Sequence, residues 1–551
     1  MGVKIGIDLG TTYSVVSYVD KTGTIRNIES AEGEKTTPSV VYFDPDGKTV
    51  VVGSTAREAG AMNPEGLVER VKNFMGDPAY RCYMNGQEYS AAAVSSLILQ
   101  KLVNDAQEAL GSEKIDGAVI TCPAYFGDAA REATRQAGEA VALRDGSHLN
   151  VLKIMDEPTA ASIAYGAAHP GDMQKTVLIY DLGGGTFDCT IMRFDFKGDD
   201  RQYQVVTTGG NHQLGGKDWD AALANYVRSE FCAMLGEDEE SMENDPESRA
   251  WFSENIEKAK KQLSARPSTK LTPSFGGRKA QVEVTAEKFD ELTEGLFNET
   301  ISLIDQMCAK KGLDFDREVD EIILVGGSTR MPQVMRGLKA RYNKPISTFD
   351  PDRAVSNGAA LIASGLQATK KSERATLVDA KKVQGGATLA TLFEDANGAT
   401  NRVVELCTKS YALGVTTRYS DGTTKDRYIN LVRKDTPKPA FGTTQAIFED
   451  GNFVIAFEDT DEISVQLYEN DSLEEEVPFE ECVDLYEPTP VPLGRVIPGG
   501  EAAADELYVD ESGQLTVIVR VLNTGEEYVV HPVRRGGNDT TMENVAGFTL
   551  A

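Results

Sequence analysis

The sequence predicts an α/β domain made of two similar halves, followed by an all-β domain. From Met1 to about Gly365, β-rich apolar runs alternate with helical patterns, as in α/β architectures. Within this region a strand–turn–strand stretch with Asp-Leu-Gly occurs twice, as IGIDLGTTYSVV (5–16) and LIYDLGGGTFDCTIM (178–192), and 181 − 8 = 173 residues separate the two aspartates. After about residue 407, short β-branched runs alternate with Asp, Gly, Asn and Pro, which is typical of a sandwich.

The first domain is expected to contain clear strands and amphipathic helices in turn. Strands are predicted at VKIGID (3–8), AVITCP (118–123), TVLIYD (176–181) and EIILVGG (321–327), and helices at 90–110, 127–143 and 156–168. The apolar stripes of these helices are explained by core packing. Because each half begins with the repeated element, we expect a duplicated fold with a ligand cleft between the halves.

Changes in residue composition and in hydrophobic periodicity predict the domain boundaries. We expect the α/β domain at 1–365 and a polar connecting region, rich in small residues, at 366–406. The β-sandwich is expected at 407–535 and a flexible tail at 536–551.

Composition excludes several classes of function. The 551 residues carry a formal net charge of −30, which argues against nucleic acid or an anionic membrane as a partner bound through a basic surface. The seven cysteines form no CxxC pair, so neither a zinc site nor a disulfide framework is expected. No apolar run is long enough to span a bilayer and no signal sequence is recognisable, so we expect a cytoplasmic protein in a reducing compartment.

The repeated element predicts a phosphate site. A strand that ends in Asp before small residues places a carboxylate at the mouth of a cleft and leaves backbone N–H groups free for an anion. Glycines let phosphate oxygens approach and threonines add hydroxyl donors, here Gly10, Thr11, Thr12, Gly183, Gly184, Gly185 and Thr186. Carboxylates repel a polyphosphate unless a divalent cation lies between them, so Asp8, Asp181 and Asp188 imply Mg²⁺. No GxxxxGK[ST] motif occurs, which excludes the P-loop route.

Seven stretches in order resemble the signature motifs of the seventy-kilodalton heat-shock chaperones, within the actin and sugar-kinase superfamily. They are IGIDLGTTYSVV, AVITCPAYFGDAAREATRQAGEAV, KIMDEPTAASIAYG, LIYDLGGGTFDCTIM, LGGKDWD, IEKAKKQLS and IILVGGSTRMPQV. The resemblance covers nearly all of residues 1–365. It implies an actin-like duplicated ATPase domain with a central nucleotide cleft, which hydrolyses ATP to ADP and phosphate.

The resemblance also implies roles for individual residues. Asp8, Thr11, Thr12 and Tyr13 match the first phosphate loop of the family, and Asp181 with Gly183 to Thr186 match the second. Hydrated Mg²⁺ and nearby K⁺ would lie at Asp8, Asp181 and Asp188. Lys72 matches the lysine that positions the attacking water and stabilises charge on the γ-phosphate; without the resemblance it reads as a surface lysine. The catalytic set would be Lys72, Glu157, Asp181 and Thr186, with Pro123 and Arg131 in a conformational relay.

A second group of residues matches the ribose and base pocket of the family. Gly215 and Gly216 match a close approach to the phosphates. Glu257, Lys260, Lys261 and Ser264 have helical spacing, so one side of a helix would hold ribose and adenine. The pocket would be closed by Gly326, Gly327, Ser328, Arg330 and Asp352. Lys261 stands where an arginine commonly stacks on adenine, so that contact is expected to be weaker.

The β-rich region resembles the start of a peptide-binding β-sandwich. Its apolar linker would correspond to Val403, Val404 and Leu406, and its entry to YALG (411–414). The resemblance implies that a pocket between loops binds unfolded or extended apolar peptide segments, and that a J-domain co-chaperone and a nucleotide exchange factor are partners. Tyr419 and Phe457 suit either the core or the surface.

Several features depart from the family pattern. Glu405 interrupts the apolar linker, and Lys153 and Asp156 replace an Arg and an Asn in a region that the family uses near its J-domain partner. A short insertion, RDGSH (144–148), lies beside that region. No long Leu-periodic stretch follows the sandwich to form a helical lid, so fast peptide exchange is expected.

Three functions are therefore considered. The favoured one is an ATP-hydrolysing chaperone in which nucleotide changes the affinity of the β-domain for unfolded segments. The alternative is a nucleotide-binding regulatory or adaptor module with weak ATPase that recognises one specific protein. A small-molecule kinase of the same superfamily is disfavoured by the β-domain, for which a kinase has no evident need.

Overall fold

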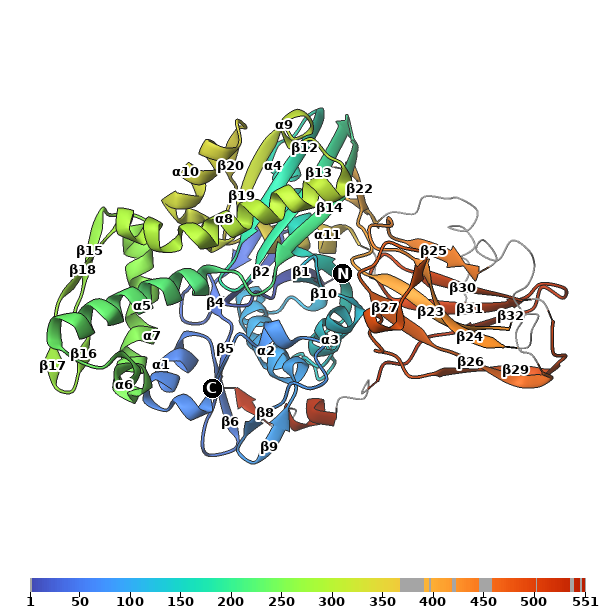
Figure 1. The fold of residues 1–551 in the computed structure, drawn as a ribbon, viewed down its shortest axis with the longest axis horizontal. Coiled ribbons are helices and arrows are strands. Elements are labelled where there is room, and N and C mark those ends of the chain that lie inside the picture. The colour runs from blue at the N-terminus through green and yellow to red at the C-terminus, as the bar shows by residue number, and fades with distance from the viewer. Residues whose placement is uncertain are drawn as a thin grey trace.

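The structure, a computed structural model, describes residues 2–366, 391–395, 398–418, 423–444, 458–501, 503–535, 540–545 and 548–550. Two lobes of an α/β domain lie side by side, and a β-rich domain packs at one end of them (Figure 1). We call the half built on the first sheet lobe I and the half built on the second sheet lobe II.

The two lobes repeat one sheet topology. In lobe I the strand order is β11-β10-β1-β2-β3, in which β1, β2 and β3 form an antiparallel meander and β10 and β11 add in parallel to β1. In lobe II, β12, β13 and β14 form the meander and β19 and β20 add in parallel to β12. The strands are β1 (Val3–Asp8), β2 (Tyr13–Val19), β3 (Ile25–Ile28), β10 (Ile115–Cys122), β11 (Val151–Asp156), β12 (Met173–Leu182), β13 (Phe187–Lys197), β14 (Asp200–Asn211), β19 (Glu321–Val325) and β20 (Ile346–Thr348). The predicted duplicated α/β fold is confirmed.

Two helices cross between the lobes. Helix α4 (Glu157–Ala168) follows the lobe I sheet, yet it contacts the lobe II strands, and α11 (Ala354–Gly365) follows the lobe II sheet but packs on the lobe I strands. The crossing is so close that a Cβ at Gly358 would lie 1.7 Å from the Ala160 carbonyl oxygen. Small residues at this point therefore hold the two lobes against each other beneath the cleft.

Further elements cover and extend each lobe. Lobe I adds β4 (Thr37–Pro38), β5 (Val40–Phe43), β6 (Thr49–Val52), α1 (Ser54–Met62), β7 (Leu67–Glu69), β8 (Cys82–Met84), β9 (Gln87–Tyr89), α2 (Ala91–Leu110) and α3 (Asp128–Glu139). Lobe II adds α5 (Gly216–Leu235), α6 (Glu239–Asn244), α7 (Pro246–Leu263), β15 (Ser268–Leu271), β16 (Ser274–Phe275), β17 (Arg278–Lys279), β18 (Val282–Thr285), α8 (Ala286–Lys311), α9 (Phe315–Glu318) and α10 (Pro332–Arg341).

Part of the predicted connecting region belongs to the lobe II sheet. Strand β22 (Thr400–Val404) pairs in parallel with β14, and β21 (Thr391–Glu394) pairs with β22 at the sheet edge. Val403 of β22 and Phe393 of β21 are buried in the core that α4 and β14 share, which explains why both strands add to this sheet. The prediction of a plain connection at 366–406 is therefore wrong for its second half. The first half, 367–390, lies outside the described residues.

The β-rich domain is a sandwich of two antiparallel sheets. One has the order β27-β23-β24-β28 and the other β25-β30-β31-β32, while β26 and β29 form a separate pair. The strands are β23 (Ser410–Arg418), β24 (Thr424–Val432), β25 (Ala440–Thr443), β26 (Thr460–Val465), β27 (Leu467–Asn470), β28 (Glu476–Val477), β29 (Thr489–Ile497), β30 (Ala503–Val509), β31 (Leu515–Val521) and β32 (Glu527–Val530). Apolar side chains such as Leu413, Leu507 and Val519 fill the space between the sheets. Tyr419 and Phe457 lie outside the described residues.

The last described residues do not form the flexible tail that the sequence predicts. A 3-10 helix, η6 (Thr540–Val545), packs against α2 and β9, and β33 (Thr549–Leu550) pairs in parallel with β6. Figure 1 shows this red segment and the C-terminal end among the blue elements of lobe I, away from the sandwich that precedes it. The physical reason is that Met542, Val545, Phe548 and Leu550 pack against the lobe I core.

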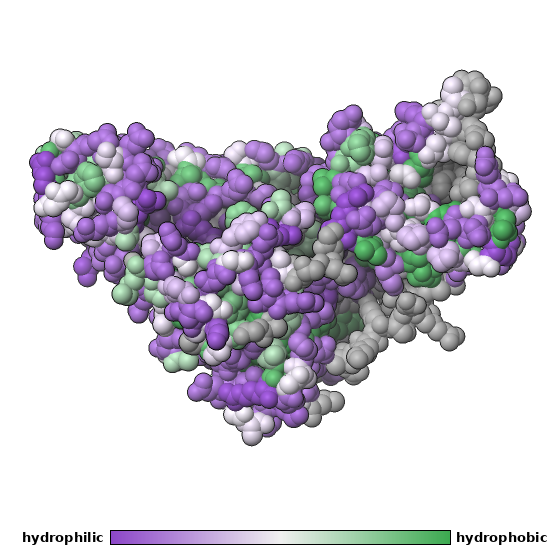
Figure 2. All heavy atoms as spheres, turned by 90° about the horizontal axis from the view of Figure 1, so that it is seen from below, coloured by the Kyte–Doolittle hydropathy of each residue, from purple (hydrophilic) through white to green (hydrophobic). Residues whose placement is uncertain are grey.

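The described residues form no large apolar patch on the face that Figure 2 presents. The face in Figure 2 is largely hydrophilic, and its hydrophobic residues lie in small separate groups. Among the described residues, no helix has the length and apolar character needed to cross a membrane.

Candidate nucleotide site

The two repeated Asp-Leu-Gly elements face each other between the lobes. A Cβ built on Gly184 would lie 2.1 Å from Thr12 Oγ1, and one on Gly185 would lie 2.7 Å from Thr11 Cγ2. The turn after Asp8 in lobe I therefore touches the turn after Asp181 in lobe II. Only glycine permits this approach. The structure thus brings together the two loops that the sequence predicts to bind phosphate.

Four carboxylates lie behind the two loops, of which Glu157, Asp181 and Asp188 are buried and Asp8 is half-buried. Asp8 ends β1, Asp181 lies near the end of β12, and Asp188 stands directly opposite Asp181 in the β12–β13 register. Glu157 begins α4 and completes the group. Lys72, in the 3-10 helix η2 (Val71–Phe74), is the cation of this group; it is 5% exposed and forms an ion pair with Glu157.

This excess of negative charge raises the pKa values of the aspartates. Burial, followed by repulsion from Glu157, raises the pKa of Asp8 to about 7 and that of Asp181 to about 8. The pKa of Asp188 is raised well above its ordinary value for the same reasons. Burial lowers the pKa of Lys72, but attraction to Glu157 and Asp8 outweighs burial and raises it. The ammonium therefore remains charged at neutral pH.

The aspartates suit a divalent cation that keeps its water shell. Four carboxylates, three of them buried, with one lysine leave negative charge that a hard cation would offset, and Mg²⁺ prefers oxygen ligands and retains several waters. In the described part of the chain, no three His, Cys, Asp or Glu side chains converge as direct ligands. The donor set fits an Mg²⁺ held through water at Asp8, Asp181 and Asp188.

The second loop is supported by the start of α5 and by the turn after β19. The amides of Gly216 and Lys217 donate to the carbonyls of Gly183 and Gly184 at 3.0 and 2.8 Å, and Ser328 Oγ donates to the Gly183 carbonyl at 2.9 Å. Gly215 packs on Gly185, where a Cβ would lie 2.5 Å from its carbonyl carbon. The predicted phosphate-side residues Gly215, Gly216 and Ser328 therefore meet at one place.

Gly326 has a positive φ of 83°, and a Cβ there would lie 2.4 Å from Asp181 Oδ1. Lys260 is buried beside the same loop, where its ammonium donates to the Gly216 carbonyl at 2.9 Å and to Asp220 at 2.8 Å. The turn after β19 and helix α7 thus approach the phosphate side of the cleft from lobe II.

A polar bridge joins the lobes above the cleft. The Tyr13 hydroxyl donates to Glu257 at 3.1 Å, and Lys261 pairs with Glu257 at 2.8 Å while lying 5.4 Å from the centre of the Tyr13 ring. Arg57 of α1 lies 3.9 Å from the same carboxylate and donates to the Tyr13 hydroxyl at 3.3 Å. Lys261, predicted to contact adenine, is therefore engaged in this bridge. Sequence reasoning missed Arg57, because nothing in its helix distinguishes it from a surface arginine.

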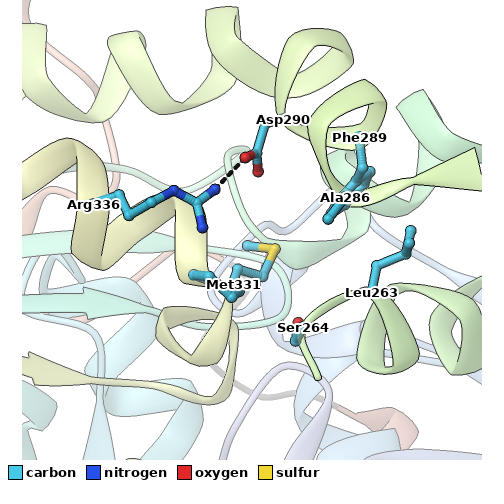
Figure 3. Close-up of a pocket in the computed structure, with 8 residues that line it drawn as sticks. Leu263, Ser264, Ala286, Phe289, Asp290, Met331 and Arg336 are labelled. Atoms are coloured by element: carbon cyan, nitrogen blue, oxygen red, sulfur yellow. Dashed lines mark hydrogen bonds and ion pairs between the residues drawn. The ribbon is translucent and has the colours of Figure 1, made fainter. Parts of the chain in front are cut away.

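The predicted base pocket borders a small cavity that is lined by residues of α8, of α10 and of the end of α7. Ser264 and Leu263 lie on one side of it, and Met331, Asp290 and Arg336 lie on the other (Figure 3). Arg330 pairs with Asp352 at 2.5 Å, and a Cβ on Gly327 would lie 3.5 Å from Asp352 Oδ1. The five residues predicted to close the pocket thus lie close together in space: Gly326, Gly327, Ser328, Arg330 and Asp352.

The predicted relay residues lead from the cleft to the sandwich. Pro123 is buried at the end of β10, and Arg131 of α3 donates to the Phe126 carbonyl at 2.9 Å and pairs with Asp156. Asp156 directly precedes Glu157, the partner of Lys72. Its amide donates to Glu405 at 3.3 Å, so the relay contacts the segment that joins the lobe II sheet to the sandwich.

The three substituted positions at which the chain departs from the family pattern, Lys153, Asp156 and Glu405, meet in one buried cluster. Lys153 lies 3.4 Å from Glu405, and Lys438 of the sandwich approaches the same carboxylate at 3.8 Å. Burial raises the pKa of Glu405, but attraction to the two lysines outweighs burial and lowers it to about 2. Lys153 and Asp156 are 4% and 3% exposed, so both are covered by the sandwich contact in this arrangement. Glu405, which interrupts the apolar linker, thus forms ion pairs with one lysine of lobe I and one lysine of the sandwich.

The sandwich also contacts lobe I at the start of α3. Arg534 pairs with Asp128 at 2.6 Å, and the Tyr486 hydroxyl donates to the same carboxylate at 2.8 Å. Thr408 donates to the Phe126 carbonyl at 3.1 Å. The β-domain therefore rests on the same helix that carries Arg131.

Comparison with known proteins gives one family. The model of the family described as "Hsp70 protein" matches residues 4–408. Proteins named "Chaperone protein DnaK" from Thermotoga petrophila and Thermotoga neapolitana are 39% and 40% identical to this chain over 385 residues. A protein of the same name from Thermosipho melanesiensis is 38% identical over 367 residues.

The matching regions cover 68% of this chain and 62% of each Thermotoga protein, and 65% of this chain and 59% of the Thermosipho protein. The chain thus matches less than two thirds of the length of these curated relatives. Because the family model nevertheless spans both lobes and the connection to the sandwich, the chain belongs to the Hsp70 protein family.

Proposed function

We propose that the protein is an Hsp70-type chaperone that hydrolyses ATP to ADP and phosphate to control the binding of unfolded or extended peptide segments. The observation that carries the proposal is the pair of glycine loops in contact across the cleft, with buried carboxylates behind them and Lys72 among these carboxylates. An α/β cleft of this kind favours a polyphosphate that arrives with a cation.

Several residues would act on bound ATP. The backbone N–H groups of the two loops, with Thr11, Thr12 and Thr186, would bind phosphate oxygens. Lys72 would stabilise charge on the γ-phosphate and orient the attacking water, and Glu157 would hold the ammonium in place through its ion pair. Mg²⁺ held through water by Asp8, Asp181 and Asp188 would neutralise phosphate charge, and K⁺ would lie nearby.

Nucleotide state would reach the β-domain through the relay. Lys72 pairs with Glu157, its neighbour Asp156 pairs with Arg131, and the Asp156 amide contacts Glu405. A change in the position of Glu157 on hydrolysis would therefore alter the contacts that hold the sandwich. Extended peptide would bind between the loops of the sandwich; loops 419–422 and 445–457 lie outside the described residues. We also propose a J-domain co-chaperone and an exchange factor as partners, and the cytosol as location.

Single-turnover hydrolysis of ATP tests the catalytic assignment. Replacing Lys72 with Ala should lower the rate on the order of 10²-fold, because the charge that stabilises the transition state is removed. Lys258→Ala is the matched control, since Lys258 of helix α7 is an exposed lysine. An unchanged rate in Lys72→Ala would show that the catalytic assignment is wrong.

Peptide binding in ATP and in ADP tests whether nucleotide state changes the affinity of the β-domain for peptide. A fluorescent apolar peptide should dissociate faster in ATP than in ADP, and Arg131→Ala should reduce this difference because it breaks the relay. The adaptor alternative, a weak ATPase with one folded partner, is favoured by the buried ionic contact that holds the sandwich on the lobes. That alternative would be preferred if the protein binds ATP but the peptide binds equally well with either nucleotide.

A further inference from the structure

The sandwich is attached to the α/β domain at both of its ends. At its start, β22 adds to the lobe II sheet and Glu405 anchors the next turn. At its end, Arg534 contacts α3 of lobe I, and residues 540–545 and 548–550 lie on another part of the same lobe. We call residues 540–545 and 548–550 the strap.

The strap is held by backbone pairing and by specific side chains. Strand β33 pairs with β6 at the edge of the sheet β33-β6-β5-β7, and the Thr549 amide donates to the Lys48 carbonyl at 2.9 Å. Thr541 is buried and accepts a hydrogen bond of 2.9 Å from the amide of Ser90, the N-cap of α2. Asn544 donates to the Glu88 carbonyl at 3.0 Å. These contacts satisfy backbone groups that a free edge strand and a free helix start would leave open.

An aromatic contact anchors the end of the strap. The ring of Phe548 lies edge-on to Phe43 with centroids 5.6 Å apart, and 5.9 Å from the ring of Tyr89. Phe43 and Tyr89 belong to the buried core of lobe I, at 2% and 1% exposure. Such pairs are worth about 0.5–1.5 kcal/mol beyond the area that they bury. The strap is therefore an integral part of the lobe I packing.

The length of the connection limits how far the sandwich can move. Arg535 is bonded to the sandwich through its amide, which donates to the Leu485 carbonyl at 3.0 Å. Between Arg535 and Thr540 there are 540 − 535 = 5 residue steps, which span at most about 18 Å when fully extended. While the strap is bound, the end of the sandwich cannot lie farther than this from η6.

We propose that the strap holds the sandwich on lobe I, so that the two domains separate fully only when the strap leaves β6. This goes beyond the proposed function and rests on it only where nucleotide drives the separation. The strap would shift the docking equilibrium toward the contact that Asp128, Arg131 and Glu405 make.

Hydrogen exchange of the full chain, first without nucleotide, tests the proposal with two variants. Phe548→Glu places a charge in the apolar contact and should release the strap, which raises exchange at least about ten-fold both in β6 and at the docking contact, residues 126–131 and 405–408. The second variant inserts twelve Gly/Ser residues between Arg535 and Thr540. It should leave β6 protected and raise exchange at the docking contact by up to about eight-fold, because lengthening the connection from four to sixteen residues lowers the effective concentration by the 3/2 power.

Phe479→Glu is the control, because Phe479 is an exposed aromatic of the sandwich and its replacement should change neither region. If both variants exchange like the parent at the docking contact, the strap is a packing element of lobe I alone and the proposal is wrong. The insertion variant retains every strap contact, so it decides the question even if Phe548→Glu unfolds lobe I. Because these measurements need no ATP, failure of the ATPase assignment would not be mistaken for failure of the strap.

Discussion

The nucleotide cleft and the docking contact of the sandwich each bring five charged side chains together, but the ratio of carboxylates to cations differs. The cleft holds four carboxylates and one cation, and the docking contact holds two carboxylates and three cations. The cleft group is Asp8, Glu157, Asp181, Asp188 and Lys72, and the docking group is Arg131, Lys153, Asp156, Glu405 and Lys438.

This difference in balance changes the pKa values. The pKa of Asp181 in the cleft is raised to about 8, whereas that of Glu405, which faces two lysines, is lowered to about 2. Asp156 has one direct cation, Arg131, and burial raises its pKa. Matched charges therefore hold two parts of the protein together, whereas unmatched charges leave a site that needs a ligand.

The largest effect should follow from breaking the matched group. Replacing Glu405 with Ala leaves Lys153 and Lys438 buried without their carboxylate, which should lower the free energy of unfolding by about 3–5 kcal/mol. Chemical denaturation measures this loss. The control is Glu475→Ala, which removes an exposed partner of Arg433 and should change stability little. A Glu405→Ala protein as stable as the parent would show that the docking charges are not matched to each other.

Removing a charge from the unmatched group of the cleft should instead increase the stability of the protein. Replacing Asp181 with Asn removes one buried negative charge and should raise the stability of the nucleotide-free protein at pH 8.5, while Mg²⁺-dependent nucleotide binding weakens. Because the folded pKa of Asp181 is raised, the parent loses stability as pH rises from about 4 to about 8. The gain should therefore fade toward pH 4.

Thermal unfolding across this pH range measures the gain, and Asp200→Asn, in the exposed β13–β14 hairpin, is the control. A gain in stability that does not vary with pH would contradict the assignment of charge excess to Asp181.

Binding of Mg²⁺ and nucleotide should release protons. Near pH 7 Asp8 and Asp181 bind protons in the free protein, and a nearby cation favours their charged forms, so roughly one proton should leave per Mg²⁺–nucleotide bound. Calorimetry in two buffers of different ionisation enthalpy measures this release. Titration of ATP with a chelator present serves as the control. Equal heats in both buffers would mean that the carboxylates are already ionised.

The smallest effect is expected at the rim of the cleft. Lys261 is 63% exposed in its side chain and its pair with Glu257 is partly solvated, so Lys261→Ala should weaken nucleotide binding by less than about five-fold. Lys260→Ala should weaken it more, because Lys260 is buried against the Gly216 carbonyl. Equilibrium titration of a fluorescent nucleotide compares the two. If Lys261→Ala loses more nucleotide affinity than Lys260→Ala, the exposure of a lysine does not determine how much it contributes to binding.

Local sequence patterns were enough to predict the two glycine-containing loops of the cleft and the β-sandwich. The Asp-Leu-Gly repeat carries both the strand ending and the glycines of the loop, so Asp8 and Asp181 could be placed from sequence. Arg57 and Lys438 could not, since each meets its partner Glu257 or Glu405 from a different lobe or domain. The strap was missed for a similar reason. A short polar segment with few apolar residues resembles a flexible tail in the sequence, and its pairing with β6 and its contact with Phe43 appear only in the structure.

The sequence by itself determined the duplicated α/β fold, the β-sandwich and the residues that line the cleft. Hydrophobic periodicity and glycine-rich turns encode these features within short stretches of chain. Only the tertiary structure decided which buried charges are matched, where β22 adds to a sheet, and that residues 540–545 and 548–550 return to lobe I. These features depend on contacts between residues far apart in the chain, and no local pattern specifies which distant groups will meet.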